Sequence, residues 1–335
     1  MVRHSVAAAA AVPSAPETAM IRHDPVDAAK ARTARPADAA SRPSAFTALG
    51  MRAEAEAIAP GLHVVATPIG NLRDITLRAI ATLAAADAVI AEDTRVSHNL
   101  LAHYGVTTPL VAYHEHNAAA VRPHLLARLA EGAALALISD AGTPLVSDPG
   151  YKLVAEALAA GIPVTSVPGP SAVLAALVVA GLPTDRFFFE GFLPPKSAAR
   201  RARINELAFV PATLVFFESP RRLAEMLADL VAELGDRPAA VARELTKLYE
   251  TTRRGALGEL AAQFGSEAPP KGEIVVLVGP PAAAGPIGDE ELDRLLQGAL
   301  ESLSVKDAAA AISAQTGAPR RLVYARALAL AGARR

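Results

Sequence analysis

The sequence predicts an α/β protein with two α/β domains and a small helical module at the C-terminal end, on three observations. From residue 62, short runs rich in β-branched residues alternate with helical stretches, which is typical of a parallel sheet with helices on both faces. After Pro183 a second group of strands follows, in pairs so close together that they indicate a mixed sheet. A linker with several prolines and glycines at residues 280–288 then precedes three helical patterns.

The N-terminal domain is predicted to cover residues 61–182. Its strands are expected at residues 62–66, 88–91, 110–112, 135–139 and 163–167, each followed by a helix. In a parallel α/β sheet, all the links that follow strands lie at the carboxyl edge, which is where ligands bind. The unusual residues of this chain are concentrated in those links.

The C-terminal α/β domain is predicted to cover residues 183–280. We expect strands at residues 186–190, 213–217, 239–243 and 274–278, and a further one near residues 249–255. The predicted helices are residues 197–208 and 221–234.

The last segment, residues 289–335, is predicted to form a basic module similar to a helix-turn-helix. Ser304 and Asp307 have the spacing of a capping box, with Asp in place of the usual Glu, and the helix that they begin should stop near Gly317. A final helix follows from residue 318, and this end of the chain carries five arginines and no acidic residue.

Residues 1–60 are rich in Ala, Pro, Arg and Ser and lack sustained apolar periodicity, so we expect a mostly disordered extension. The chain as a whole is 52% hydrophobic and 20% charged, which is enough for large buried cores. It has no cysteine, which excludes disulfide scaffolds, cysteine-based metal sites and thiol nucleophiles, and fits a reducing compartment. Residues 157–184 carry no charge but are interrupted by proline and glycine, so no membrane span is expected.

Three of the turns at the carboxyl edge are rich in glycine and proline: residues 67–71, 140–144 and 168–172. In the second, Gly142 lets the backbone approach a ligand, and Asp140 offers a carboxylate to a ribose hydroxyl or an amino group. These turns fit a nucleoside-like cofactor, although tight turns with helix caps would explain each of them singly. A nucleotide-binding P-loop, a dinucleotide-binding glycine motif and a serine-hydrolase elbow are all absent.

Charged residues follow the second and third strands. Glu92 and Asp93 with Arg95 could position a substrate or accept a proton, while acidic residues at a helix start also favour the helix dipole. His114 and His116 flank an acid, but two histidines without a third ligand are weak evidence for a metal, and none is predicted. Further along, Lys196, Arg200 and Arg201 concentrate positive charge at a helix start, where a solvated helix face is the plain alternative.

Taken together, these motifs resemble the tetrapyrrole-methylase superfamily of S-adenosyl-L-methionine-dependent methyltransferases. Within it they are most similar to the members that methylate a cytidine ribose 2'-hydroxyl in 16S ribosomal RNA. The resemblance covers residues 61–280 and rests on eight short motifs in order. These are residues 66–71, 91–95, 113–117, 139–144 with 147–150, 168–172, 191–194, 218–222 and 243–247.

The resemblance implies two α/β domains of tetrapyrrole-methylase type with the cofactor in a cleft between them. Carried over residue by residue, the contacts to S-adenosyl-L-methionine would come from Pro68, Asp140, Gly142, Thr143, Ser171 and Ala172, with Glu218 and Gly272 from the second domain. The hydroxyl proton would pass to Glu92, Asp93 or His114, with Arg95 as a partner for phosphate or carboxylate. Lys196, Arg200, Arg201, Arg320 and Arg321 would contact RNA phosphates.

The expected partner is therefore 16S rRNA in the small ribosomal subunit, acted on in its decoding region by a cytoplasmic homodimer with no membrane association. Two alternatives stay open at this point. A tetrapyrrole or precorrin C-methyltransferase would use the same cofactor cleft, and a ribosome-assembly factor could keep the fold and bind RNA without catalysis. Steep salt dependence of binding would favour RNA over a small molecule, and methyl incorporation would exclude the binding factor.

Overall fold

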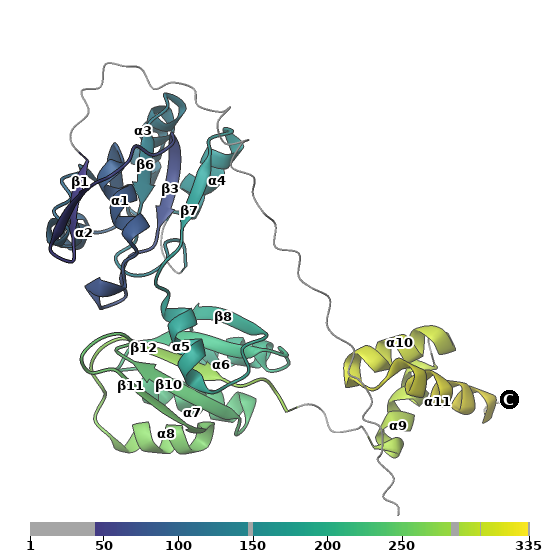
Figure 1. Cartoon of the computed structure of the whole chain (residues 1–335). Coiled ribbons are helices and arrows are strands. Elements are labelled where there is room, and N and C mark those ends of the chain that lie inside the picture. Colours follow the sequence, from purple (N-terminus) through teal and green to yellow (C-terminus); the bar gives the residue numbers. More distant parts are fainter. Residues whose placement is uncertain (1–43, 147–149, 283–287, 302, 334–335) are drawn as a thin grey trace, which may run out of the picture. The chain divides into compact units, whose positions relative to one another are not determined.

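The computed structural model describes residues 44–146, 150–282, 288–301 and 303–333 (Figure 1). Its first large sheet is fully parallel, with strand order β5-β4-β6-β3-β7. The five predicted strands are confirmed to within two residues. They are β3 (Gly61–Val65), β4 (Ala88–Ala91), β5 (Leu110–Ala112), β6 (Ala134–Leu137) and β7 (Val164–Val167).

Helices cover both faces of this sheet because its strands are apolar on both sides. Alternate residues of β4 belong to different cores: Val89 packs with α1 (Leu77–Ala85) and α2 (Thr94–His103), whereas Ile90 packs with α3 (Ala118–Ala130) and α4 (Tyr151–Ala159). The side chain of Thr76 caps α1, and that of Asp93 caps α2. Residues 147–149 of the fourth motif, directly before α4, lie outside the described residues.

The assignment of all of residues 1–60 to a disordered extension is wrong for the end of that range. β1 (Ala45–Ala48) and β2 (Met51–Glu54) form an antiparallel hairpin. Phe46 of this hairpin is buried in the core beside α1, and the Thr47 amide donates to the Tyr104 carbonyl oxygen at 2.7 Å. A strand this short gains its stability from tertiary packing, which local periodicity does not register. The rest of the predicted extension, residues 1–43, lies outside the described residues.

The second large sheet is mixed, as predicted, with strand order β11-β10-β12-β9-β8. β8 runs parallel to β9, and the other neighbours are antiparallel. The strands are β8 (Phe187–Phe192), β9 (Thr213–Glu218), β10 (Pro238–Arg243), β11 (Thr251–Ala256) and β12 (Ile274–Val278).

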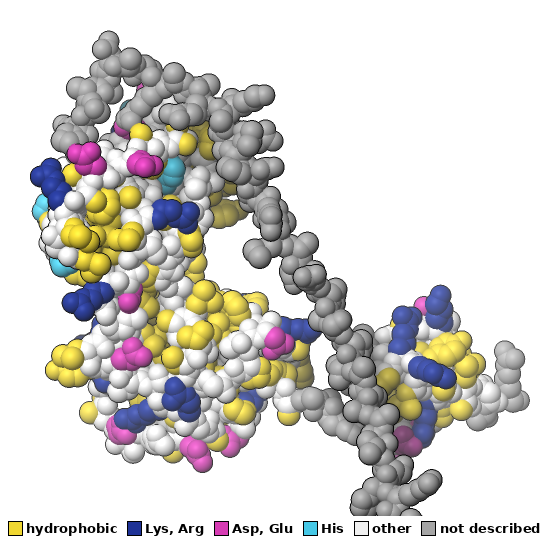
Figure 2. Space-filling model, in the orientation of Figure 1, with side chains coloured by type: hydrophobic (Ala, Val, Ile, Leu, Met, Phe, Trp, Pro, Cys, Tyr) yellow, Lys and Arg dark blue, Asp and Glu magenta, His cyan; other side chains and the backbone are white. Residues whose placement is uncertain are grey.

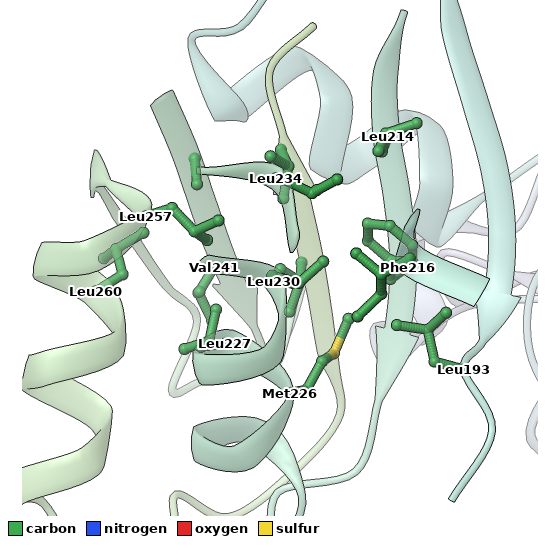
Figure 3. Close-up of a cluster of buried hydrophobic side chains, with 14 of the residues drawn as sticks. Leu193, Leu214, Phe216, Met226, Leu227, Leu230, Leu234, Val241, Leu257 and Leu260 are labelled. Atoms are coloured by element: carbon green, nitrogen blue, oxygen red, sulfur yellow. The ribbon is translucent and has the colours of Figure 1, made fainter. Parts of the chain in front are cut away.

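One face of this sheet packs against α6 (Ser197–Leu207), α7 (Leu223–Leu234) and α8 (Leu257–Ser266), where Phe216 and Met226 are fully buried (Figure 3). The other face packs against α5 (Ala172–Ala180), a helix that the sequence assigned to the first domain. The first domain thus ends at the turn that precedes α5 rather than after the helix.

The C-terminal module consists of α9 (Asp289–Ala299), α10 (Val305–Thr316) and α11 (Arg320–Ala333) around a small core of its own. The predicted capping box is present, since the Ser304 hydroxyl accepts from the Asp307 amide at 3.2 Å and donates to its carboxylate at 2.6 Å. α10 ends at Gly317, which has φ +67°. Arg326 ties α11 to α9 through ion pairs with Asp289 and Asp293 at 2.8 and 2.6 Å. Within the described parts of the chain, no helix has the length and apolar character that crossing a bilayer requires.

Candidate active site

Three turns at the carboxyl edge of the parallel sheet are bonded directly to one another. The Thr67 amide donates to the Gly142 carbonyl at 2.8 Å, and the Gly142 amide donates to the Thr67 carbonyl at 3.1 Å. The Thr143 hydroxyl donates to the Pro170 carbonyl at 3.1 Å, which adds the turn after β7. The turns after β3, β6 and β7 therefore form one rigid backbone surface.

Gly142 is the position at which this surface requires glycine. Its φ is +81°, and a Cβ there would lie 3.2 Å from Cγ2 of Ile69. A side chain would therefore be strained and would press into the neighbouring turn. Without one, the backbone of the turn is open to a ligand.

A cavity of about 410 Å³ lies against this surface and is lined by turns at the edge of the parallel sheet and by strands and loops of the second sheet. Its size is that of an ordinary small-ligand site. Most of its wall is apolar, with Phe192, Phe217 and Leu245 opposite the three turns. Six of the eight predicted cofactor residues line it: Gly142, Thr143, Ser171, Ala172, Glu218 and Gly272.

The structure gives Ser171 and Glu218 local partners. Ser171 is the N-cap of α5, with its hydroxyl 3.5 Å from the Leu174 amide. The Glu218 side chain is completely buried, and its carboxylate accepts from the Ser219 amide at 2.6 Å and from the Arg222 guanidinium at 2.9 Å. Glu218 therefore shapes the cavity wall, and its carboxylate is already satisfied by the protein.

Gly272 leaves room for the loop of the 243–247 motif, whose backbone strain was not predicted from the sequence. Glu244 and Thr246 have left-handed backbone conformations, with φ +53° and +66°, and between them Leu245 lines the cavity. A Cβ on Gly272 would lie only 2.3 Å from Cδ of Glu244. That carboxylate in turn accepts from the Lys247 ammonium at 2.9 Å and the Glu273 amide at 3.0 Å.

Pro68 and Asp140, the other two predicted cofactor residues, line a second cavity of about 350 Å³. The two cavities have Ile69, Ala141 and Glu273 in common. Ser97, Asn99 and Lys247 also line the second cavity. Lys247 ends the motif at residues 243–247, whereas Ser97 and Asn99 lie in none of the eight motifs. The complete lining of the second cavity is Thr67, Pro68, Ile69, Gly70, Leu72, Val96, Ser97, Asn99, Leu100, Ser139, Asp140, Ala141, Lys247 and Glu273.

Glu92 and Asp93 differ strongly in their protonation behaviour. Burial and the nearby negative charge of Asp140 raise the pKa of Glu92 above its ordinary value, against a smaller lowering by His114. Hydrogen bonds from Arg95, whose guanidinium lies 2.6 Å from the carboxylate, lower the pKa of Asp93 to about 2. The Asp93 amide also donates to the Asp140 carboxylate at 3.1 Å, which joins the ends of β4 and β6.

The structure places none of Glu92, Asp93, Arg95 and His114 in the wall of either cavity described above. Glu92 and Asp93 are instead linked to the second cavity through Asp140. Because Asp93 is paired with Arg95 and caps α2, it is a poor proton acceptor. Of the two carboxylates, Glu92 is therefore the better proton acceptor.

His114 lies at the end of β5, and its ring is 6.0 Å from that of His116. Its backbone amide donates to the Asn117 side chain at 2.8 Å, while its ring Nδ1 is buried without a hydrogen-bond partner among the described residues. Nowhere in the described ranges do three or more His, Asp or Glu side chains gather in a way that could hold a metal ion.

The prediction that Arg200 binds RNA is wrong. Its side chain is only 1% exposed, and its guanidinium lies 2.7 Å from Asp229 on α7. Arg201 is about half exposed and forms an ion pair with Glu233 at 2.6 Å. Lys196 is exposed at the start of α6. Of the three, only Lys196 and Arg201 are accessible to a phosphate.

Arg320 and Arg321 are exposed at the start of α11. Figure 2 shows several basic side chains on this module. Tyr324 and Leu328 lie on the same helix and are 43% and 50% exposed. Basic and apolar side chains on one exposed helix are typical of a surface that meets nucleic acid.

The fold and the site define a two-domain α/β protein with a ligand cavity at the carboxyl edge of its parallel sheet. Residues 61–261 match the family model of tetrapyrrole (corrin/porphyrin) methylases, and residues 286–331 match that of the RsmI C-terminal HTH domain. The crystal structure of diphthine synthase shares the fold, with a TM-score of 0.52 at 18% identity over 65% of this chain and 89% of that chain.

Two curated relatives extend the similarity over most of the chain, and both are named ribosomal RNA small subunit methyltransferase I. The protein from Mesorhizobium japonicum is 54% identical over 82% of this chain and 94% of the relative. The protein from Xylella fastidiosa strain Temecula1 is 49% identical over 79% of this chain and 98% of the relative. The chain therefore belongs to the tetrapyrrole methylase family and, within it, to the ribosomal RNA small subunit methyltransferase I proteins.

Proposed function

We propose that this protein transfers a methyl group from S-adenosyl-L-methionine to ribosomal RNA of the small subunit. The acceptor that we propose is the ribose 2'-hydroxyl of a cytidine in the decoding region of 16S rRNA. The observation that carries this proposal is the 410 Å³ cavity against three mutually bonded turns, in a chain whose relatives are named as rRNA methyltransferases.

The residues around this cavity fit the cofactor. Its apolar wall suits an adenine ring and a methionine side chain, and the bare backbone at Gly142 and Ala172 offers hydrogen-bonding groups at close approach. Asp140, at the junction with the second cavity, offers a carboxylate to hydroxyl or amino donors. When bound, S-adenosyl-L-methionine supplies a methyl group activated by a sulfonium, so the protein has to align the acceptor and take up one proton.

We propose that Glu92 accepts the proton that the ribose hydroxyl loses during methyl transfer. Its carboxylate lies near Asp140 beside the second cavity, and its raised pKa makes it a stronger base than Asp93. Asp93 and Arg95 satisfy each other at 2.6 Å and hold the start of α2. Their role is therefore to position that helix.

The C-terminal module is proposed to hold the RNA. Arg320 and Arg321 are exposed, carry no ion pair among the described residues, and begin the second helix of a helix-turn-helix-like pair. Contacts of this kind to phosphates position RNA without reading its sequence. Lys196 and Arg201 on α6 are proposed as additional phosphate contacts.

The protein is also proposed to act as a homodimer. α5 is apolar on all sides: Val173, Ala176 and Leu177 are buried against the second sheet, whereas Leu174 and Val178 are 54% and 79% exposed. A helix that is apolar all round is normally covered on all sides. A second copy of the chain is the proposed cover.

The decisive experiment supplies the protein with labelled S-adenosyl-L-methionine and small ribosomal subunits that lack the modification. Digestion of the RNA to nucleosides should recover the label as 2'-O-methylcytidine. Label on a base, or transfer to a tetrapyrrole but not to RNA, would reject the proposal. RNA binding without label would identify a binding factor instead.

Two variants test whether the cavity binds the cofactor and the C-terminal module binds the RNA. Asp140→Ala should weaken binding of S-adenosyl-L-methionine, measured by calorimetry without RNA. The double variant Arg320→Ala, Arg321→Ala should retain cofactor binding and lose affinity for the small subunit, with a salt slope shallower by about 2. Equal loss of both functions in both variants would contradict this assignment.

A further inference from the structure

The second cavity lies beside the proposed cofactor cavity and has chemistry of its own. It is lined by the turns after β3 and β6, by residues 96–100 of α2, and by Lys247 and Glu273 from the second sheet's loops. It shares Ile69, Ala141 and Glu273 with the first cavity, so groups bound in the two would meet. Its volume of about 350 Å³ is sufficient for a nucleoside.

Ser97 gives direct evidence that something binds here. The residue is 2% exposed, and its hydroxyl is buried without a hydrogen-bond partner among the described residues. Thr67 and Thr213 are buried hydroxyl residues that do have partners: Thr67 donates to the Ser139 carbonyl at 3.1 Å, and Thr213 donates to the Pro183 carbonyl at 2.6 Å. Among the described residues, the Thr246 hydroxyl is also buried without a partner, but Thr246 does not line this cavity. Since an unpaired buried hydroxyl costs free energy of folding, one kept in a cavity wall indicates a ligand that pairs with it.

The charges of the cavity select the kind of ligand. Lys247 is neutralised by Glu244 at 2.9 Å and Glu273 at 3.0 Å. Asp140 has no ion-pair partner in the described ranges, which leaves the wall with a net negative charge. Such a wall repels a phosphate and favours an uncharged group with several hydrogen-bond donors, such as ribose hydroxyls and an exocyclic amino group.

We infer that the second cavity receives the target ribonucleoside of the RNA, turned out of its strand, and that the Ser97 hydroxyl fixes it by a hydrogen bond. This inference rests on the proposed function and adds the place of the acceptor. The apolar side chains of Leu72, Val96 and Leu100 provide surfaces against which the base lies. Ser97 is a positioning and binding residue, while the transferred proton passes to Glu92.

Lys247 holds the two parts of this cavity together. Its aliphatic chain lies where a side chain on Gly70 would be, because a Cβ there would be 2.5 Å from Cγ of Lys247. The ammonium is bonded to Glu244 and Glu273. The turn after β3 and the loop that carries Lys247 are thus fixed against each other, and the cavity exists before RNA binds.

The test uses Ser97→Ala and Val96→Trp in the full chain. Ser97→Ala should lower kcat/KM for small ribosomal subunits by about 10- to 100-fold, which is the effect of one lost buried hydrogen bond. The affinity for S-adenosyl-L-methionine, measured without RNA, should be unchanged, and the thermal midpoint should not fall. Val96 is 45% exposed, so a tryptophan there is accommodated by the fold while it fills the cavity and abolishes methylation.

Ser166→Ala on β7 is the matched control, because Ser166 is exposed and lies outside both cavities. The inference is overturned if Ser97→Ala and Val96→Trp methylate subunits at the rate of the unaltered protein. It is also overturned if either variant loses cofactor affinity as much as it loses turnover, since the cavity would then serve the cofactor. Failure of the unaltered protein to methylate RNA would instead contradict the proposed function.

Discussion

Replacement of Gly272 by alanine is the sharpest test of how the cavity wall is built. The residue has φ +98°, and the new Cβ would lie 2.3 Å from Cδ and 2.4 Å from Cγ of Glu244. Both the carboxylate and the stem of Glu244 must therefore move. The left-handed backbone costs an alanine about 1–2 kcal/mol, and each displaced hydrogen bond about 0.5–1.5 kcal/mol.

Glu244 accepts bonds from Lys247 and from the Glu273 amide, so we expect Gly272→Ala to lower the free energy of unfolding by about 2–5 kcal/mol. Urea titration followed by circular dichroism measures this change. Gly265→Ala is the matched control, because Gly265 lies in α8 with nothing within 4 Å of a new Cβ. That variant should be stabilised by about 0.5–1 kcal/mol. A Gly272→Ala protein within about 0.5 kcal/mol of the unaltered one would refute the reasoning.

Three further predictions concern charge and assembly. Arg200→Met should destabilise the protein by about 3 kcal/mol in urea unfolding, because it leaves Asp229 without its ion-pair partner and only with the hydroxyl of Ser197, and it should not change the affinity for RNA. Val178→Asp should convert dimers to monomers in sedimentation analysis, and a dimer that persists would exclude α5 as the interface. Glu92→Gln should abolish methyl transfer yet raise the thermal midpoint at neutral pH, whereas Asp93→Asn should retain most of the activity.

The parts of the fold that could be predicted from sequence are those with local causes. Most of the ten strands of the two large sheets follow apolar runs bounded by turn residues, with β11 and its two arginines as the clearest exception, and α10 follows its capping box and Gly317. α8 was missed because its N-cap is Ala256 rather than a typical capping residue: Glu259 accepts from the Ala256 amide at 3.3 Å, and the Gly258 amide donates to Asp236, 22 residues earlier. Local capping signals cannot report such a contact.

In the candidate site, too, features with a local cause in the sequence were predictable, and features that depend on distant residues were not. The glycine and proline turns at the carboxyl edge were predictable, since parallel-sheet topology alone brings the strand ends together. The burial of Arg200 depends on its ion pair with Asp229, 29 residues later. The position of the Lys247 ammonium depends on its hydrogen bond to Glu273, 26 residues later. Ser97 carries no motif, and only its burial without a partner distinguishes it from other helix serines.

The opposite pH responses of Glu92 and Asp93 separate catalysis from structure. Because the fold raises the pKa of Glu92, the native state disfavours its ionised form, so this residue costs stability once the pH rises through the raised pKa. Under the proposed role of Glu92 as proton acceptor, activity needs that same ionised form and is expected to fall as the pH drops through the raised pKa. Glu92→Gln should thus gain stability only where the unaltered enzyme is active, and the gain should vanish in acid.

Asp93 behaves in reverse, since its pKa of about 2 means that it contributes stability above its ordinary pKa and loses it as the pH falls toward 2. Asp93→Asn should therefore be less stable than the unaltered protein at neutral pH. The loss should be small, because asparagine can still cap α2. If Asp93→Asn abolished transfer and Glu92→Gln did not, the proton would pass through the Asp93–Arg95 pair, and the assignment to Glu92 would be wrong.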